Sequence, residues 1–228
     1  KGTLIGGNGR TQTSSWDLVA QTQTRSESVD SYTLIGSQTR NTFSRVASVT
    51  TGGDGVRTEG TSFRIQHYNA TDGSAVASYE IGDSVTVDPV SQTRTTGKTR
   101  QVSGSINGEM KTLFTLNTSA SVNADGSSRN GESSVLSRYG ADGHLLGAAG
   151  FESAVSDDGY GNKTFTNAHQ TYASVGDRAR LKKVESASVA KRYGEPLIDG
   201  KASVVSEQET NTVLVYDLFT LEGDGHTF

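Results

Sequence analysis

Glycine follows aspartate in this sequence far more often than chance allows. Seven of the fourteen aspartates precede a glycine, whereas random placement of the 27 glycines gives about two such pairs, so the pairing signals turns. Both Asp-Gly and Asn-Gly suit two-residue β-hairpin loops, because a type I′ turn needs positive φ at both central residues. The sequence therefore predicts serial hairpins, with turns at Asp-Gly pairs starting at 54, 72, 125, 142, 158, 199 and 224 and Asn-Gly pairs starting at 8, 107 and 130.

Apolar and polar residues alternate between these turns. In residues 61–68 (TSFRIQHY), Phe63, Ile65 and His67 share one face and polar residues occupy the other. This period of two is typical of a strand. Four intervals between these pairs, 54–72, 107–125, 125–142 and 142–158, are 16–18 residues long, which leaves strands of about seven residues after the turns are subtracted.

Residues 176–194 are ambiguous between helix and strand. Asp177 could cap a helix, and Gly194 could lie just beyond its end. The serine and β-branched residues within the segment favour a strand.

A longer repeat overlies the hairpin pattern. Residues 47–80 and 120–152 share an Ala-Ser-Val start, two Asp-Gly pairs with a tyrosine between them, and a final aromatic-Glu pair, at an offset of about 71 residues. Residues 188–207 form a weaker copy. We expect residues 1–228 to be a single repetitive β region and a fragment of a longer protein. The predicted fold is all-β, with antiparallel β-hairpin repeats forming an elongated sheet, a solenoid or a sandwich-like array.

Composition narrows the classes of function. Isoleucine, leucine, valine and phenylalanine make up about 20% of the chain, which allows only a thin core. The absence of cysteine excludes disulfides and thiolate chemistry. No apolar run reaches the length of a membrane helix, so we expect no membrane span. The basic cluster in residues 178–192 lacks interleaved aromatics, so we expect no nucleic-acid partner.

The repeated Tyr and Asp-Gly segments are the candidate ligand-binding surface. Tyrosine rings can stack on sugars, and aspartates in turns are polar and lie at the surface. If the chain binds a ligand, we expect one repeated turn surface to do so, formed by Tyr68, Asp72, Tyr139, Asp142, Tyr193 and Asp199.

No cofactor is required by the sequence, although calcium is possible. Carboxylates and turn carbonyls are the ligands that Ca²⁺ prefers. The stretch GGDGVRTEG starts like a calcium-binding β-roll repeat, but Arg57 stands where that repeat needs an aspartate. The remaining metal candidates are weak: Asp54, Asp125, Asp157 and Asp158.

Catalytic signatures are absent from the sequence. The four histidines lack metal-ligand spacing, and no H-E-x-x-H, G-x-S-x-G or P-loop motif occurs. Carboxylate pairs such as Asp157 with Asp158 could serve a glycosidase only if the fold placed two of them across a substrate.

Three functions remain as hypotheses. The first is an extracellular or cell-surface module, structural or adhesive, that repeats within a fibre, adhesin or surface assembly and self-associates or packs against neighbouring repeats. The second is a carbohydrate- or calcium-binding β module whose partner is a polysaccharide or another cell-surface ligand. The third is a polysaccharide-acting enzyme. The selected turns, the repeat and the thin core favour the first.

Overall fold

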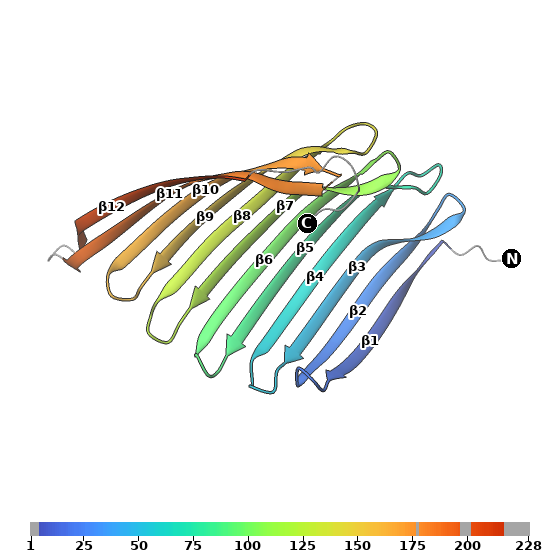
Figure 1. The fold of residues 1–228 in the computed structure, drawn as a ribbon. Coiled ribbons are helices and arrows are strands. Elements are labelled where there is room, and N and C mark those ends of the chain that lie inside the picture. The colour runs from blue at the N-terminus through green and yellow to red at the C-terminus, as the bar shows by residue number, and fades with distance from the viewer. Residues whose placement is uncertain (1–4, 177, 197–201, 217–228) are drawn as a thin grey trace.

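The computed structural model describes residues 5–176, 178–196 and 202–216, and these form one antiparallel sheet of twelve strands (Figure 1). Every strand pairs with its neighbours in the chain, so the order along the sheet is the order in the sequence. The strands are β1 (Gly6–Asp17), β2 (Thr22–Ile35), β3 (Gln38–Thr51), β4 (Arg57–Tyr68), β5 (Ala75–Asp88), β6 (Thr93–Ile106), β7 (Glu109–Val122), β8 (Ser128–Tyr139), β9 (Leu145–Asp157), β10 (Asn162–Val175), β11 (Arg178–Pro196) and β12 (Ala202–Val215).

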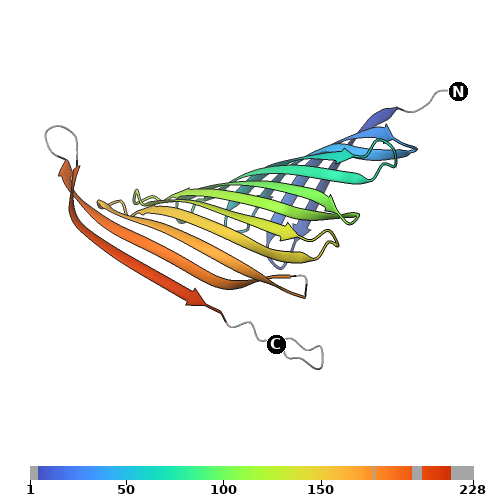
Figure 2. The same cartoon turned by 90° about the horizontal axis from the view of Figure 1, so that it is seen from above.

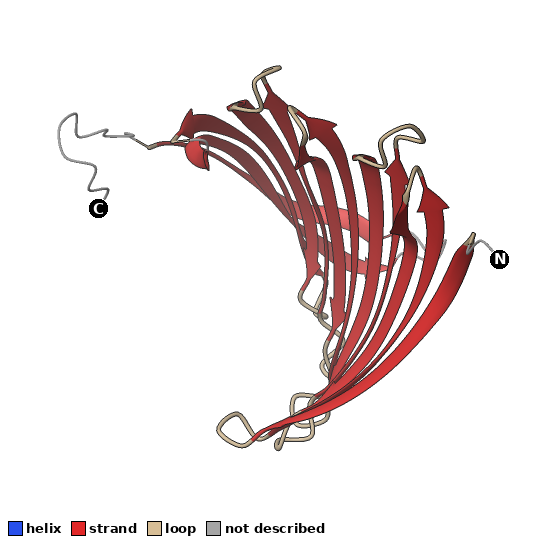
Figure 3. Cartoon of the chain, turned by 90° about the vertical axis from the view of Figure 1, so that its right-hand side faces the viewer, coloured by secondary structure: helices blue, strands red, loops and turns tan. Residues whose placement is uncertain are grey.

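The predicted all-β fold and elongated hairpin sheet are confirmed. The sheet twists along its length and bends across it, and its first and last strands lie at opposite sides (Figures 1, 2 and 3). The described residues form a single layer, with neither a solenoid nor a second packed sheet. None of the described residues belongs to a helix that could cross a membrane. Residues 178–196 form β11, as the strand interpretation predicts.

The predicted strand length is wrong. The strands contain 12–19 residues instead of about seven. The Asp-Gly pairs at 54 and 72 show the reason, because β4 alone fills almost all of the chain between them. A tight turn needs only a few residues, so the spacing between turns is nearly the length of one strand.

All five Asp-Gly pairs in the described residues lie in turns, but their conformation differs from the prediction. The glycines have positive φ, from 70° at Gly73 to 85° at Gly143, whereas no Asp-Gly aspartate does. At Gly55 the amide donates to the Gly52 carbonyl over 3.0 Å, which is a type I turn ending in a left-handed glycine. The pairs that start at 199 and 224 lie outside the described residues.

Only one of the three Asn-Gly pairs forms a turn. Asn107 and Gly108 have φ of 52° and 78° and connect β6 to β7, as a type I′ turn requires. The predictions for Asn8 and Asn130 are wrong, since both lie inside strands. Asn130 pairs with Ala120 on one side and Val155 on the other. Cross-strand pairing overrides the local turn preference there.

One face of the sheet carries small side chains. A row, meaning residues that lie opposite one another on successive strands, crosses all twelve strands and contains only Gly, Ala, Ser and Thr. We call it the small-residue row, and the face on which it lies the small-residue face. From β1 to β12 its members are Thr13, Ser26, Ser48, Gly60, Ser84, Gly97, Ser119, Gly131, Ala154, Thr166, Ser188 and Thr210.

Hydroxyl groups connect the strands on this face. Within the small-residue row, Thr13 Oγ1 lies 2.6 Å from Ser26 Oγ. In the neighbouring row of the same face, Thr58 Oγ1 lies 2.9 Å from Thr86 Oγ1, and a similar pair joins β2 to β3. Cross-strand hydroxyl pairs of this kind stabilise a sheet that buries little apolar surface.

The opposite face, here called the apolar face, carries most of the large apolar side chains. One of its rows runs over six consecutive strands without a polar residue: Phe43, Ile65, Tyr79, Val102, Phe114 and Leu136. Several of these side chains are open to solvent, with Leu136 53% exposed and Ile65 43% exposed.

Among the described residues, the buried ones other than glycine all lie on the small-residue face: Ser103, Leu145, Ala148, Ala154 and Ala168. Bending a sheet crowds the side chains on its inner side, so we infer that this face lines the inside of the bend. No large side chain is fully buried among the described residues. The accessible surface is 15,422 Å², whereas a compact protein of this mass exposes about 9,900 Å². The thin core inferred from composition is therefore spread over an open sheet.

Candidate functional site

Tyr68 and Tyr139, two of the predicted binding residues, occupy matching positions. Each is the last residue of its strand, β4 or β8, at the same end of the sheet. The Tyr68 hydroxyl donates to the Asn41 carbonyl over 2.8 Å, and the Tyr139 hydroxyl donates to the Thr112 carbonyl over 3.2 Å. Both side chains thereby connect their strand to the preceding one where the backbone pairing has ended.

A β-bulge adjoins each of these contacts. The register of β2 and β3 shifts next to Asn41, and the register of β6 and β7 shifts next to Thr112. A bulge leaves backbone groups without a ladder partner, so a hydroxyl donor is favourable at such a position. The Arg40 guanidinium also lies over the Tyr68 ring, 5.6 Å from its centroid. Both tyrosine hydroxyls are thus committed to holding strands together.

Asp72 and Asp142, the acidic partners of these tyrosines, lie in the turns that follow. Their carboxylates accept the backbone N–H of the residue two positions on, which is Ser74 over 2.8 Å and His144 over 3.1 Å. The Ser74 amide and hydroxyl hold the pKa of Asp72 below its ordinary value. Each Tyr and Asp set is separated from the next by four strands, about 19 Å, so the two sets are separate places on the sheet.

Tyr193 lies at the other end of the sheet. Its backbone amide donates to the carbonyl of Gly161, in the turn between β9 and β10, over 2.8 Å. It is therefore not brought into one surface with Tyr68 and Tyr139. Asp199 lies outside the described residues.

The four metal candidates lie at the same end of the sheet as Tyr193, three of them in turns and Asp157 as the last residue of β9. The carboxylates of Asp54, Asp125 and Asp158 each accept the backbone N–H two residues on, as Asp72 does. Asp157 accepts the Gly159 amide and pairs with Lys163 over 3.2 Å.

Hydrogen bonds lower the pKa of the Asp125 and Asp158 carboxylates. The Ser127 hydroxyl and amide lower the pKa of Asp125, and the side chain and amide of Asn162 lower that of Asp158. Over the part of the chain that the structure describes, His, Asp and Glu side chains do not gather in threes in a way that could hold a metal. A Ca²⁺ ion at one of these turns would have to share its carboxylate with the amide of the turn.

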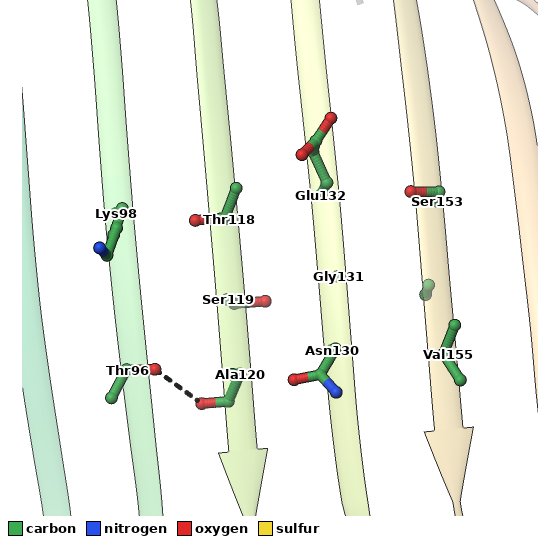
Figure 4. A pocket seen from close by; sticks show the side chains of 11 residues that line it. Thr96, Lys98, Thr118, Ser119, Ala120, Asn130, Gly131, Glu132, Ser153 and Val155 are labelled. Carbon is green, nitrogen blue, oxygen red and sulfur yellow. Dashed lines mark hydrogen bonds between the residues drawn. The ribbon is translucent and has the colours of Figure 1, made fainter.

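Shallow depressions repeat on the apolar face. One of about 430 Å³ lies over β6 to β9 and is lined by Lys98, Glu132, Asn130 and Val155 among others (Figure 4). Another of about 590 Å³ lies over β1 to β4, between the same two rows of the face. The backbone of the small-residue row, whose side chains point to the opposite face, forms the floor of both. Their chemistry suits hydroxyl-rich or weakly charged ligands, and they enclose little of any ligand.

The sequence patterns did not reveal the small-residue row. Its signal was present, because Ser48 and Ser119 are 71 residues apart, and so are Gly60 and Gly131. The spacing alone does not show that these residues lie opposite one another, because that depends on the strand register. Comparison of the chain with family models, with curated proteins and with solved structures found no match.

Proposed function

We propose that the chain is an extracellular structural or adhesive module that repeats within a fibre, an adhesin or another surface assembly. The observation that carries the proposal is the small-residue row, which crosses all twelve strands without interruption. A row that keeps its composition from one edge to the other belongs to a sheet built by repetition, in which each strand supports its neighbours.

Contacts between turns support the same role. At one end of the sheet, the Thr93 hydroxyl donates to the Asn123 side chain over 2.8 Å, which connects the β5–β6 turn region to that of β7–β8. At the other end, the Asn107 side chain donates to the Asp142 carbonyl over 2.9 Å. These hairpins are thus held at their turns as well as along their strands. Such a scaffold needs no disulfides and tolerates the oxidising conditions outside the cell.

The shape of the chain in solution tests this proposal. A compact protein of 228 residues has a radius of gyration of about 17 Å. We expect small-angle X-ray scattering to give a clearly larger value, and electron microscopy at rising concentration to show thin, elongated particles. A compact monomer, or turnover of anionic polysaccharides that is lost when Asp157 and Asp158 are replaced by Asn, would overturn the proposal in favour of an enzyme.

The repeated depressions on the apolar face favour a second candidate function, the carbohydrate- or calcium-binding module. Lys98 and Glu132 provide hydrogen-bonding groups there, and the ionised Asp125 and Asp158 provide cation ligands at the turns. Calorimetric titration with Ca²⁺ and screening against a glycan array test it. Saturable binding that is lost in Asp125→Ala or Glu132→Ala would support this module, and the absence of binding in both assays would count against it.

A further inference from the structure

Over the described residues, the sheet ends in two edge strands without a further partner, β1 and β12, which lie far apart (Figures 1 and 2). Edge strands of soluble proteins are usually blunted by proline, lysine, bulges or shortness. Here β1 has 12 residues and β12 has 14, and neither contains proline or lysine. β1 pairs with β2 in unbroken register, and β12 pairs with β11 in unbroken register from Ser206 to Val215, although the register shifts before Ser206. The described side chains of β12 from Val204 onward are all exposed. Both edges are therefore suitable for pairing with another strand.

The number of strands sets the direction of such pairing. Neighbouring strands alternate in direction, so β12 runs opposite to β1. If β1 of a second molecule lay beside β12, the pair would be antiparallel like every other pair in the sheet. The meander would then continue from one molecule into the next.

The 71-residue repeat fixes the register of this contact. In the small-residue row, each position of β1 to β4 recurs 71 residues later in β5 to β8, four strands away. Groups of four strands therefore join through equivalent pairs, which are Gly60 with Ser84 between β4 and β5 and Gly131 with Ala154 between β8 and β9. The corresponding pair after β12 joins Thr210 to Thr13.

We propose that β12 of one molecule pairs antiparallel with β1 of a second copy of this chain, with Thr210 opposite Thr13 of that copy. The proposal rests on the structural role proposed above and adds the surface, the partner and the register. It places residues 206–215 against residues 8–17 and continues the small-residue row across the boundary between molecules.

The side chains that meet in this register are compatible. On the small-residue face, Thr210 and Thr212 lie opposite Thr13 and Thr11, which would add hydroxyl pairs like the one between β1 and β2. Leu214, which is 50% exposed, lies opposite Gly9. A Cβ at Gly9 would lie 3.5 Å from Cε2 of Tyr32, so this position offers Leu214 an aromatic neighbour.

On the apolar face, the two acids of β12 meet uncharged residues. Glu207 lies opposite Trp16 and Glu209 lies opposite Ser14, so no like charges are opposed.

Paired cysteines test the register, because the natural chain has none. Antiparallel partners have Cα atoms about 4.5–5.5 Å apart, within the span of a disulfide. We expect the double variant Thr13→Cys, Thr210→Cys to form a ladder of dimers and larger species on non-reducing gels, which collapses on reduction. The pair Gln12→Cys, Asn211→Cys, which is opposed on the apolar face, should do the same. Circular dichroism verifies that each variant keeps its sheet.

The matched control combines Thr13→Cys with Asn211→Cys, whose side chains lie on opposite faces, and it should give no ladder. Single variants should not cross-link alone, whereas a mixture of the two should give a dimer and nothing larger. Cross-linking of Thr210→Cys with itself would show β12 pairing with β12 and would overturn the proposal. Assembly in the ultracentrifuge without a ladder from either pair would overturn the edge contact and leave the structural role standing. A compact monomer at all concentrations would refute both.

Discussion

The packing of the hairpin turns against one another gives the sharpest test of the structure. Gly126 and Gly159 follow aspartates in neighbouring turns at the same end of the sheet, and their φ values are 82° and 78°. A Cβ added to Gly126 would meet no atom within 4 Å. A Cβ added to Gly159 would lie 2.8 Å from the Asp125 carbonyl oxygen and 3.1 Å from the Ser127 amide nitrogen. The two glycines therefore have nearly the same left-handed backbone conformation, which would strain any other residue, and they differ in what surrounds them.

The substitutions Gly126→Ala and Gly159→Ala separate these two effects. An alanine forced into the left-handed region costs about 1–2 kcal/mol, which is the whole expected loss for Gly126→Ala. Gly159→Ala bears the same cost and must also displace backbone of the adjacent turn, which adds about 1–3 kcal/mol. We therefore expect Gly159→Ala to lower the free energy of unfolding by roughly 2–5 kcal/mol.

Urea denaturation followed by far-UV circular dichroism measures both variants, and a difference in Tm of about 2–4 °C per kcal/mol should accompany it. Hydrogen exchange of the Ser127 amide gives a local check, since it should accelerate more in Gly159→Ala than in an equally destabilised variant elsewhere. Equal losses for the two glycines would refute the conclusion that successive turns pack against each other.

Three further predictions follow from single contacts. Tyr68→Phe and Tyr139→Phe each remove one hydroxyl that donates to a backbone carbonyl, so each should lower the free energy of unfolding by about 1 kcal/mol, and a loss in only one would contradict the equivalence of the two positions. Thr58→Val leaves the hydroxyl of Thr86 without its partner and should cost about 1 kcal/mol in the same denaturation assay; no change would show that this pair is not stabilising. The pKa of Asp125 is lowered in the folded state, so the stabilising effect of its carboxylate is complete above the unfolded pKa of about 3.9 and is lost as the pH falls through the folded pKa. Acid unfolding should therefore depend less steeply on pH in Asp125→Asn. An acid transition that is the same in both proteins would refute this prediction.

The positions of the Asp-Gly turns could be predicted from the sequence because the turn preference is local, although their conformation could not. The Asp125 carboxylate finds its donor two residues along the chain, so the Asp-Gly pair alone indicates a turn. Asn130-Gly131 carries a similar local preference and still lies within β8, because its neighbours on two other strands decide its conformation. For the same reason the sequence aligned some of the candidate binding residues with one another but did not predict how all of them are arranged on the sheet. Tyr68 and Tyr139 were correctly aligned by the repeat, whereas Tyr193 lies at the other end of the sheet.

By itself, then, the sequence determined that this chain is an all-β series of hairpins and determined where most of the described turns lie. The tertiary structure alone decided that the sheet is a single open layer with a small-residue face, an apolar face and two open edges. The physical reason is that strand pairing joins residues that are distant in the chain. A slip of one residue in the register would exchange the two faces, and no local pattern fixes that register.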